Sequence, residues 1–249
     1  MNILFQSITV TNDKHNATDG CFSTAFKKET AMSDNDTEFN EWAENVIKGE
    51  NRYCQKAVIT KVKGTCPFGH KEGDTFTLTA LHAGGMCGAL LTSIMQPVAT
   101  LHYGGELVWA DSKDSFSGSC PEGGCVTVEV TREENSSGDM VTQEFPWHDM
   151  TAKGYPGIDK YRIFVEVEHI EGNCMWGHKV GDRVEIDPFN VNGMCSLFYN
   201  QLYPYLHVLL AGKTPAWATQ EHSMGGECPD IFNRLSFRMK IEPRNPEKQ

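Results

Sequence analysis

The chain of 249 residues has no run of about 18 apolar residues, the length that a helix needs to cross a membrane. Basic residues are also scarce, since 22 Lys and Arg stand against 33 Asp and Glu and the formal net charge is −11. An acidic surface repels phosphate, which argues against nucleic acid as a partner. The sequence therefore predicts no membrane partner and no nucleic-acid partner.

A secretory signal is missing as well. The stretch from Met1 to Ser7 lacks basic residues, and its apolar run is too short for export. We therefore expect a cytoplasmic protein whose nine cysteines stay mostly reduced. Because nine is an odd number, at least one cysteine has no disulfide partner in the monomer. In a reducing compartment, cysteine sets more often bind metals or take part in catalysis.

What the chain has instead is an internal repeat. The stretch Gly64-Thr-Cys-Pro-Phe-Gly-His-Lys-Glu-Gly-Asp74 returns as Gly172-Asn-Cys-Met-Trp-Gly-His-Lys-Val-Gly-Asp182, with seven of eleven positions identical. Three further matches keep the same spacing of 108 residues: Gly85-Met86-Cys87 with Gly193-Met194-Cys195, Trp109-Ala110 with Trp217-Ala218, and Cys120-Pro121 with Cys228-Pro229. Between the Gly-Met-Cys match and the Trp-Ala match the register slips by one residue and then recovers, which indicates an insertion or deletion. Two domain-sized copies are thus joined in one chain.

Each copy predicts the order strand, strand, helix, strand, strand. Alternating and β-branched residues favour strands at 57–62, 75–79, 115–120 and 126–131, and at 162–169, 183–186 and 234–241 in the second copy. Apolar stripes predict helices at 87–102 and 195–210. Each helix contains a proline, Pro97 or Pro204, which is expected to kink or divide it. The expected fold class is α+β, with two pseudo-symmetric ββαββ-type two-layer domains in tandem.

Composition sets the expected boundaries. Residues 1–37 are polar and without periodicity, and they predict a disordered leader. The first repeat domain is expected at 38–132 and begins with an amphipathic docking helix at 38–48. A linker is expected at 133–160, and the second repeat domain at 161–249.

The repeated residues also carry a resemblance. Cys-Pro-x-Gly-His-x-x-Gly-Asp starts at Cys66, and a Gly-x-Cys helix start, a Gly-Gly…Trp segment and a late Cys-Pro follow it. In this each copy resembles a small, functionally uncharacterised domain family that is common in anaerobic bacteria and archaea. The resemblance covers roughly residues 55–132 and 162–243. The family implies no agreed chemistry, so function has to be argued from the residues themselves.

Four chemistry-bearing side chains recur in each copy. They are Cys66, His70, Cys87 and Cys120 in the first copy, and Cys174, His178, Cys195 and Cys228 in the second. Three cysteines and one histidine form an established tetrahedral zinc set, and iron also accepts soft thiolates in reducing cells. The C-x₂-C pair that marks most zinc sites is missing. The first expectation is a repeated Cys₃His metal- or redox-type site with zinc or iron as cofactor.

A second interpretation makes the protein a thiol-dependent enzyme, namely an isomerase, lyase or reductase. Cys87 and Cys195 each open a helix, where free N–H groups and the helix dipole favour the thiolate. His70 and His178 would then serve as base or proton donor. The expected substrate is a small apolar or aromatic molecule in a cleft between the copies. Iodoacetamide should then alkylate Cys87 below about pH 8, and faster than Cys54.

A third interpretation is a structural interaction module whose repeated cysteines are buried small hydrophobes. Trp109 and Trp217 could bind substrate, although large aromatics more often lie in the core. Asp74 and Asp182 are expected to brace their turns. As partners we expect a small-molecule ligand, and either a monomer that reproduces a dimer internally or a homo-oligomer.

The two copies are not equivalent in sequence. The second has Met175 in place of the loop proline, Ala211 in place of Gly104, and no counterpart of Cys125. Proline fixes φ and holds a loop in one shape before a ligand arrives. We therefore expect the first copy to carry the stronger site. Cys125 is also expected to pair with Cys120 under oxidation.

Overall fold

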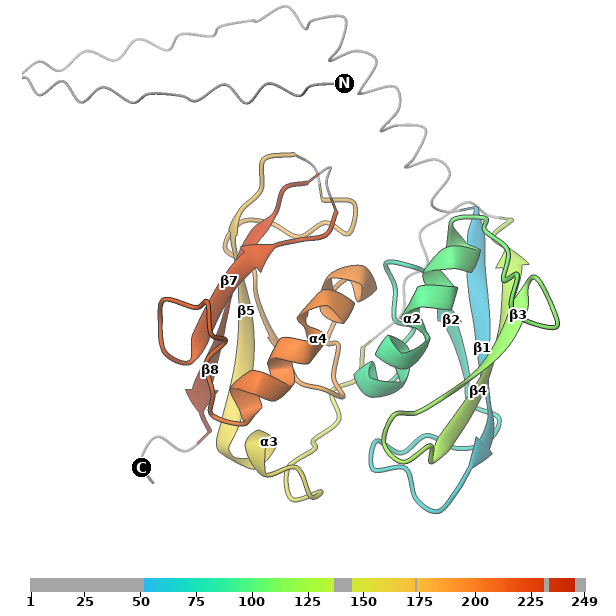
Figure 1. Cartoon of the computed structure of the whole chain (residues 1–249), viewed down its shortest axis with the longest axis horizontal. Coiled ribbons are helices and arrows are strands. Elements are labelled where there is room, and N and C mark those ends of the chain that lie inside the picture. The colour runs from blue at the N-terminus through green and yellow to red at the C-terminus, as the bar shows by residue number, and fades with distance from the viewer. Residues whose placement is uncertain (1–51, 137–144, 173, 231–232, 245–249) are drawn as a thin grey trace, which may run out of the picture.

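The computed structural model describes residues 52–136, 145–172, 174–230 and 233–244 (Figure 1). Within these ranges the chain forms two four-stranded antiparallel sheets, each packed with a helix, in tandem halves. The predicted leader at 1–37 and the docking helix at 38–48 lie outside the described residues. The α+β fold class with two pseudo-symmetric halves is confirmed.

The first half has the sheet order β2-β1-β4-β3, and the second half has the matching order β6-β5-β8-β7. The elements of the first half are β1 (Tyr53–Val62), β2 (Thr75–Leu78), α2 (Gly88–His102), β3 (Ser115–Ser119) and β4 (Val126–Glu134). Those of the second half are α3 (Pro156–Lys160), β5 (Tyr161–His169), β6 (Arg183–Ile186), α4 (Ser196–Leu210), β7 (Ser223–Glu227) and β8 (Ser236–Pro243).

The two central strands share an irregularity that the repeat preserves. The register of β1 against β4 shifts between Ile59 and Lys61, and that of β5 against β8 shifts between Val167 and His169. At this point the hairpin loop folds back, because the Gly73 N–H donates to the Ile59 carbonyl at 2.8 Å. The matching bond in the second half measures 2.9 Å. A bulge of this kind bends a strand and aims its neighbouring loop.

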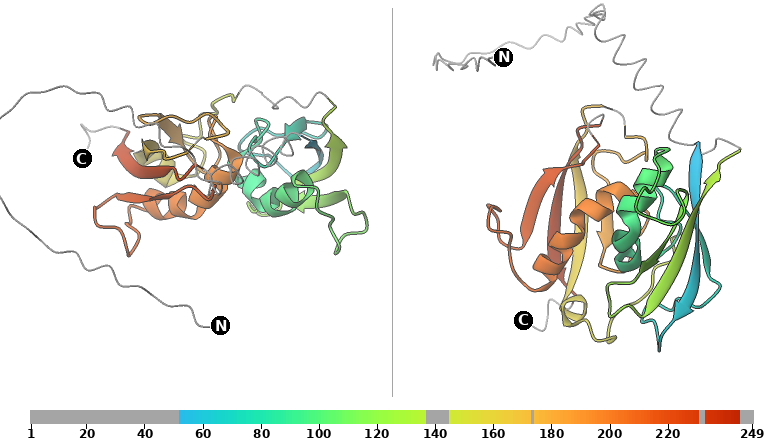
Figure 2. Two further views of the ribbon diagram at one scale, coloured as in Figure 1. Left: turned by 90° about the horizontal axis from the view of Figure 1, so that it is seen from above. Right: turned by 45° about the vertical axis from the view of Figure 1, so that its right-hand side comes forward.

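Helices α2 and α4 lie between the two sheets and face each other (Figures 1 and 2). Both run without interruption for 15 residues, so neither Pro97 nor Pro204 divides its helix as expected. The apolar stripe predicted in α2 is buried: Leu90, Leu91, Ile94, Met95, Val98 and Leu101. Burying one such side chain contributes roughly 1.5–3 kcal/mol, so the six together outweigh the roughly 3 kcal/mol that a proline inside a helix costs.

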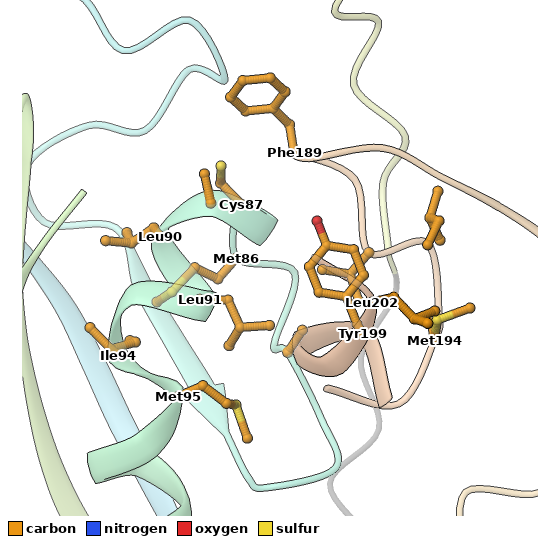
Figure 3. Packing of buried hydrophobic residues seen from close by; sticks show 14 of the residues in the cluster. Met86, Cys87, Leu90, Leu91, Ile94, Met95, Phe189, Met194, Tyr199 and Leu202 are labelled. Atoms are coloured by element: carbon orange, nitrogen blue, oxygen red, sulfur yellow. The ribbon is translucent and has the colours of Figure 1, made fainter. Parts of the chain in front are cut away.

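A reciprocal pair of hydrogen bonds joins the halves. The Gly88 N–H at the start of α2 donates to the Phe189 carbonyl, and the Ser196 N–H at the start of α4 donates to the Leu81 carbonyl, both at 2.8 Å. Residues 88 and 196, and residues 81 and 189, are the same positions in the two copies. Figure 3 shows Phe189 and Tyr199 of the second half beside the start of α2. The contact is therefore isologous, as in a two-fold symmetric dimer.

The predicted linker contains an ordered element before β5. Helix α3 packs so closely on α4 that a Cβ on Gly157 would lie 2.5 Å from the Leu210 carbonyl oxygen. Ile158 is buried, and its carbonyl accepts a bond of 2.6 Å from the Arg244 guanidinium. This part of the linker is thus anchored to the second half. No helix within the described ranges is long and apolar enough to cross a membrane.

Candidate thiol-lined sites in the two halves

The repeated loop of each half is a braced turn that sends its histidine inward. In the first half the Gly69 N–H donates to the Cys66 carbonyl at 3.0 Å, and the Lys71 N–H donates to the Asp74 carboxylate at 2.8 Å. The second half repeats both bonds, with Lys179 donating to Asp182 at 2.8 Å. The expectation that the two aspartates brace their turns is confirmed.

The cysteines at the helix starts are buried, and burial decides their protonation. Desolvation raises the pKa of Cys87 to about 12, although N–H groups of α2 oppose the rise. Cys195 behaves alike, since burial raises its pKa to about 12 against the N–H groups of α4. The expected lowering of the thiol pKa at a helix start is therefore wrong here. The cost of removing the thiolate charge from water exceeds the stabilisation that the N–H groups at the helix start provide.

The three repeated cysteines of each half lie close enough to influence one another. The Cys120 and Cys66 thiols each raise the pKa of Cys87 further. In the second half the Cys228 and Cys174 thiols act in the same way on Cys195. Even so, no group of three or more His, Cys, Asp or Glu within the described residues is arranged to hold a metal ion. The structure thus gathers the predicted thiols without forming a coordination sphere.

The two repeated imidazoles differ in their contacts. His70 Nε2 accepts a bond of 3.2 Å from the Cys87 N–H, and burial lowers the pKa of His70 to about 4. His178 has a side chain only 8% exposed, and its Nε2 has no hydrogen-bond partner among the described residues. Burial lowers the pKa of His178 as well, although Asp182 opposes this from 3.9 Å. His178 therefore presents a neutral ring with an unused nitrogen.

His178 lines a pocket of about 210 Å³ in the second half. We call it the thiol pocket, and all four repeated residues of this half border it. Its walls also include Leu81 and Tyr103, which come from the first half. The lining residues are Leu81, Tyr103, Cys174, Met175, Trp176, His178, Cys195, Leu197, Phe198, Cys228, Pro229, Asp230 and Asn233. The pocket is mainly apolar and sulfur-rich, with polar groups at few places.

In the first half two tyrosines stand over the equivalent thiols. Tyr155 lies just before α3, and its ring centroid is 4.4 Å from that of Phe189. Burial raises the pKa of Tyr155 to about 12, and Glu122 and then Cys87 raise it further. Tyr203 of α4 has its pKa raised to about 12 by burial and by the same Cys87. A tyrosine from α4 and a tyrosine from the segment between the copies thus lie close to the first-half thiols.

The remaining predicted residues lie elsewhere. Trp109 and Trp217 are 68% and 62% exposed, so the expectation that they are core aromatics is wrong. Neither borders the thiol pocket. Burial raises the pKa of Cys120 to about 11, and the nearby Cys125 thiol raises it further, which is compatible with their predicted pairing under oxidation.

Sequence reasoning missed several residues that shape these sites. Tyr155 is not part of the repeat, and Leu81 borders a pocket in the other half. Asp230 did carry a signal, because it follows Cys228-Pro229 as Glu122 follows Cys120-Pro121. An acidic residue thus recurs beside each thiol cluster.

Comparison with protein-family models, with curated proteins and with solved structures finds no match to this chain. The resemblance to the Cys-Pro-x-Gly-His family therefore rests on the repeated residues alone.

Proposed function

We propose that the protein binds a small, uncharged aromatic molecule in the thiol pocket of the second half. The observation that carries this proposal is that His178, a wall residue of an apolar pocket, has a buried Nε2 without a partner among the described residues. A buried acceptor without a donor costs about 1–3 kcal/mol. A ligand that carries a hydroxyl or N–H group would remove this cost.

The electrostatics of the pocket favour a neutral ligand. Burial raises the pKa of Cys195 to about 12 and also raises that of Cys228, so both thiols stay protonated at pH 7. Burial likewise keeps the His178 imidazole neutral. Asp230 is the acidic group on the wall, and it already accepts a bond of 3.0 Å from Asn233. A charged ligand would lose its hydration with little compensation.

The size of the pocket also fits this ligand class. An apolar cavity of about 150 Å³ is enough to hold benzene. The thiol pocket, at about 210 Å³, has room for one substituted ring. Trp176 offers a fixed aromatic wall, because its Nε1–H donates to the Gly193 carbonyl at 2.7 Å.

Binding is a better-supported role than thiol catalysis. A nucleophilic cysteine needs a thiolate fraction at neutral pH. The pKa of Cys195 at about 12 leaves almost none. We therefore assign the thiols to the lining of the pocket, where sulfur makes favourable contacts with aromatic rings.

Indole is a suitable probe for this proposal. We expect the full chain to bind indole in a calorimetric titration, and Leu81→Trp, which fills the pocket from the first half, to weaken binding at least tenfold. Val108→Trp places the same ring on a residue that is 88% exposed and should leave binding unchanged. Absence of indole binding at millimolar concentration contradicts the proposal, and so does equal binding by Leu81→Trp and the parent chain.

A second candidate function is metal binding by the repeated Cys₃His set, with zinc or ferrous iron as the ion. The mutual influence of the three thiols in each half favours it. Metal binding would have to draw the donors together and release the thiol protons. Of the two sets, the second is the better candidate, because His70 already holds the Cys87 N–H while His178 Nε2 is unused.

Elemental analysis of anaerobically purified protein tests this candidate. We expect zinc or iron in stoichiometric amount, lost in Cys174→Ser and kept in Cys54→Ser, whose thiol lies outside the repeated set. A parent chain with only trace metal removes the candidate.

A further inference from the structure

The two copies place equivalent residues around the two thiol clusters. Three wall residues of the thiol pocket have counterparts 108 residues away that line a hollow of about 270 Å³ beside the first-half thiols. The pairs are Asp230 with Glu122, Leu81 with Phe189, and Tyr103 with Ala211. Tyr103 and Ala211 each end their helix, and Gly104 matches Gly212, so the expected pairing of Ala211 with Gly104 is wrong. The lining of this hollow includes none of the four repeated residues of the first half, so the hollow only adjoins the counterpart of the thiol pocket. That counterpart is the place of Tyr155, whose neighbours Phe189, Cys87, Cys120 and Glu122 correspond to the pocket residues Leu81, Cys195, Cys228 and Asp230.

This place is filled differently in the two halves. In the first half Tyr155 occupies it, with its ring against Phe189 and its hydroxyl in the field of Glu122, Cys87 and Cys120. Tyr155 comes from the segment between the copies and not from either repeat. In the second half the corresponding space is the thiol pocket, which the described residues leave open. The first-half thiol cluster is thus next to the phenol group of Tyr155, and the second-half cluster has an open pocket at the corresponding place.

We propose that the ligand of the thiol pocket is a monocyclic phenol, for which Tyr155 is the internal counterpart in the first half. This inference rests on the proposed binding function and names its ligand class. By the symmetry of the copies, the ligand ring lies against Leu81 and beside Cys195 and Cys228. Its hydroxyl lies on the side of Asp230, as that of Tyr155 lies on the side of Glu122.

The chemistry of a phenol matches what the pocket offers. A phenol with a pKa near 10, like that of free tyrosine, is neutral at pH 7 and needs no counter-ion. Its hydroxyl can donate one hydrogen bond, and the wall residue His178 offers Nε2 as an acceptor without a partner among the described residues. An apolar ring without a hydroxyl would leave this acceptor unused.

para-Cresol is the side chain of tyrosine as a free molecule, and toluene is the same ring without the hydroxyl. We expect the full chain to bind one equivalent of para-cresol, at least fivefold more tightly than toluene. His178→Phe should reduce this preference, because it removes the ring nitrogen that lacks a partner. Toluene binding as tight as that of para-cresol overturns the phenol inference and leaves the proposed function standing. Absence of binding by indole, toluene and para-cresol overturns both.

The claim about Tyr155 has its own test. Tyr155→Ala should empty the first-half site, so that the variant binds two equivalents of para-cresol and is stabilised by it more than the parent chain. Tyr205→Ala, which removes a tyrosine that packs on Trp217 instead, should still bind one equivalent. Leu81→Trp combined with Tyr155→Ala should bind one equivalent, at the first-half site. A folded Tyr155→Ala protein that binds one equivalent overturns the claim that the two sites are counterparts.

Discussion

The junction between the halves leaves no room for a methyl group at Gly88, and this gives a sharp prediction for Gly88→Ala. A Cβ built on Gly88 would lie 2.6 Å from Cζ and 2.9 Å from Cε1 of Tyr199, and its nearest contact would be the Tyr199 hydroxyl oxygen. Ordinary contacts of this kind begin at about 3.4 Å. The Tyr199 ring would therefore have to move by several tenths of an ångström or more.

Tyr199 cannot move without loss. It is fully buried, and its hydroxyl donates a bond of 2.7 Å to the Asp187 carbonyl. Overpacking costs about 1–3 kcal/mol, and a buried carbonyl left without its donor about 1–3 kcal/mol more. Alanine regains up to about 1 kcal/mol through its helix propensity. We therefore expect Gly88→Ala to lower the free energy of unfolding by about 2–4 kcal/mol.

Ser196 offers the matched control, because it holds the same position at the start of α4. Its hydroxyl is buried and has no partner among the residues described. Ser196→Ala therefore removes an unsatisfied group and should leave stability unchanged or raise it. Calorimetry should show a melting temperature lower by about 5–10 °C for Gly88→Ala only, since 1 kcal/mol corresponds to about 2–4 °C at this size. Equal melting temperatures for the two variants would refute the reasoning.

Three further predictions follow from buried titratable groups. Burial lowers the pKa of His70 from 6.5 to about 4, so the unfolded chain binds a proton at this residue at a higher pH than the folded chain does. The free energy of unfolding should therefore fall by about 3 kcal/mol as the pH decreases from 6.5 towards 4. Urea titrations should show this loss in the parent chain and not in His70→Gln. Since burial raises the pKa of Cys87 and of Cys195 from 9.0 to about 12, the folded chain keeps both protons, and stability should fall as the pH rises from 9 towards 12. A Cys87→Ser/Cys195→Ser chain with the same alkaline loss contradicts this. At pH 8 iodoacetamide should label the half-buried Cys54 before Cys87, which is 3% exposed; mass spectrometry showing the reverse order would restore the activated thiolate.

Much of the fold could be predicted because it depends on local patterns. The apolar stripe from Leu90 to Leu101 and the alternation at Thr75–Leu78 place a helix and a strand within one or two residues of their observed bounds. Helix α3 was missed, because five residues are too few for a helical period to show. The first residues of β1 were not predicted either, because Gln55 is a polar residue and is nevertheless fully buried.

The site was predictable only as far as the repeat reaches. Recurrence alone brought Cys66, Cys87 and Cys120 together as one set. It could not show that burial outweighs the helix start at Cys87, because burial depends on how the two copies pack. The same packing carries Leu81 into the pocket of the other half and brings Tyr155 close to the first-half thiols.

The reciprocal bonds from Gly88 to Phe189 and from Ser196 to Leu81 have a consequence for how this molecule can vary. Each thiol cluster is completed by residues of the opposite half, so a substitution in one copy alters the environment of the other. The two copies can therefore diverge in function only together, because a substitution near one cluster also changes contacts at the other. A relative with a single copy would reach the same arrangement only by self-association, at a cost in entropy that covalent linkage removes here.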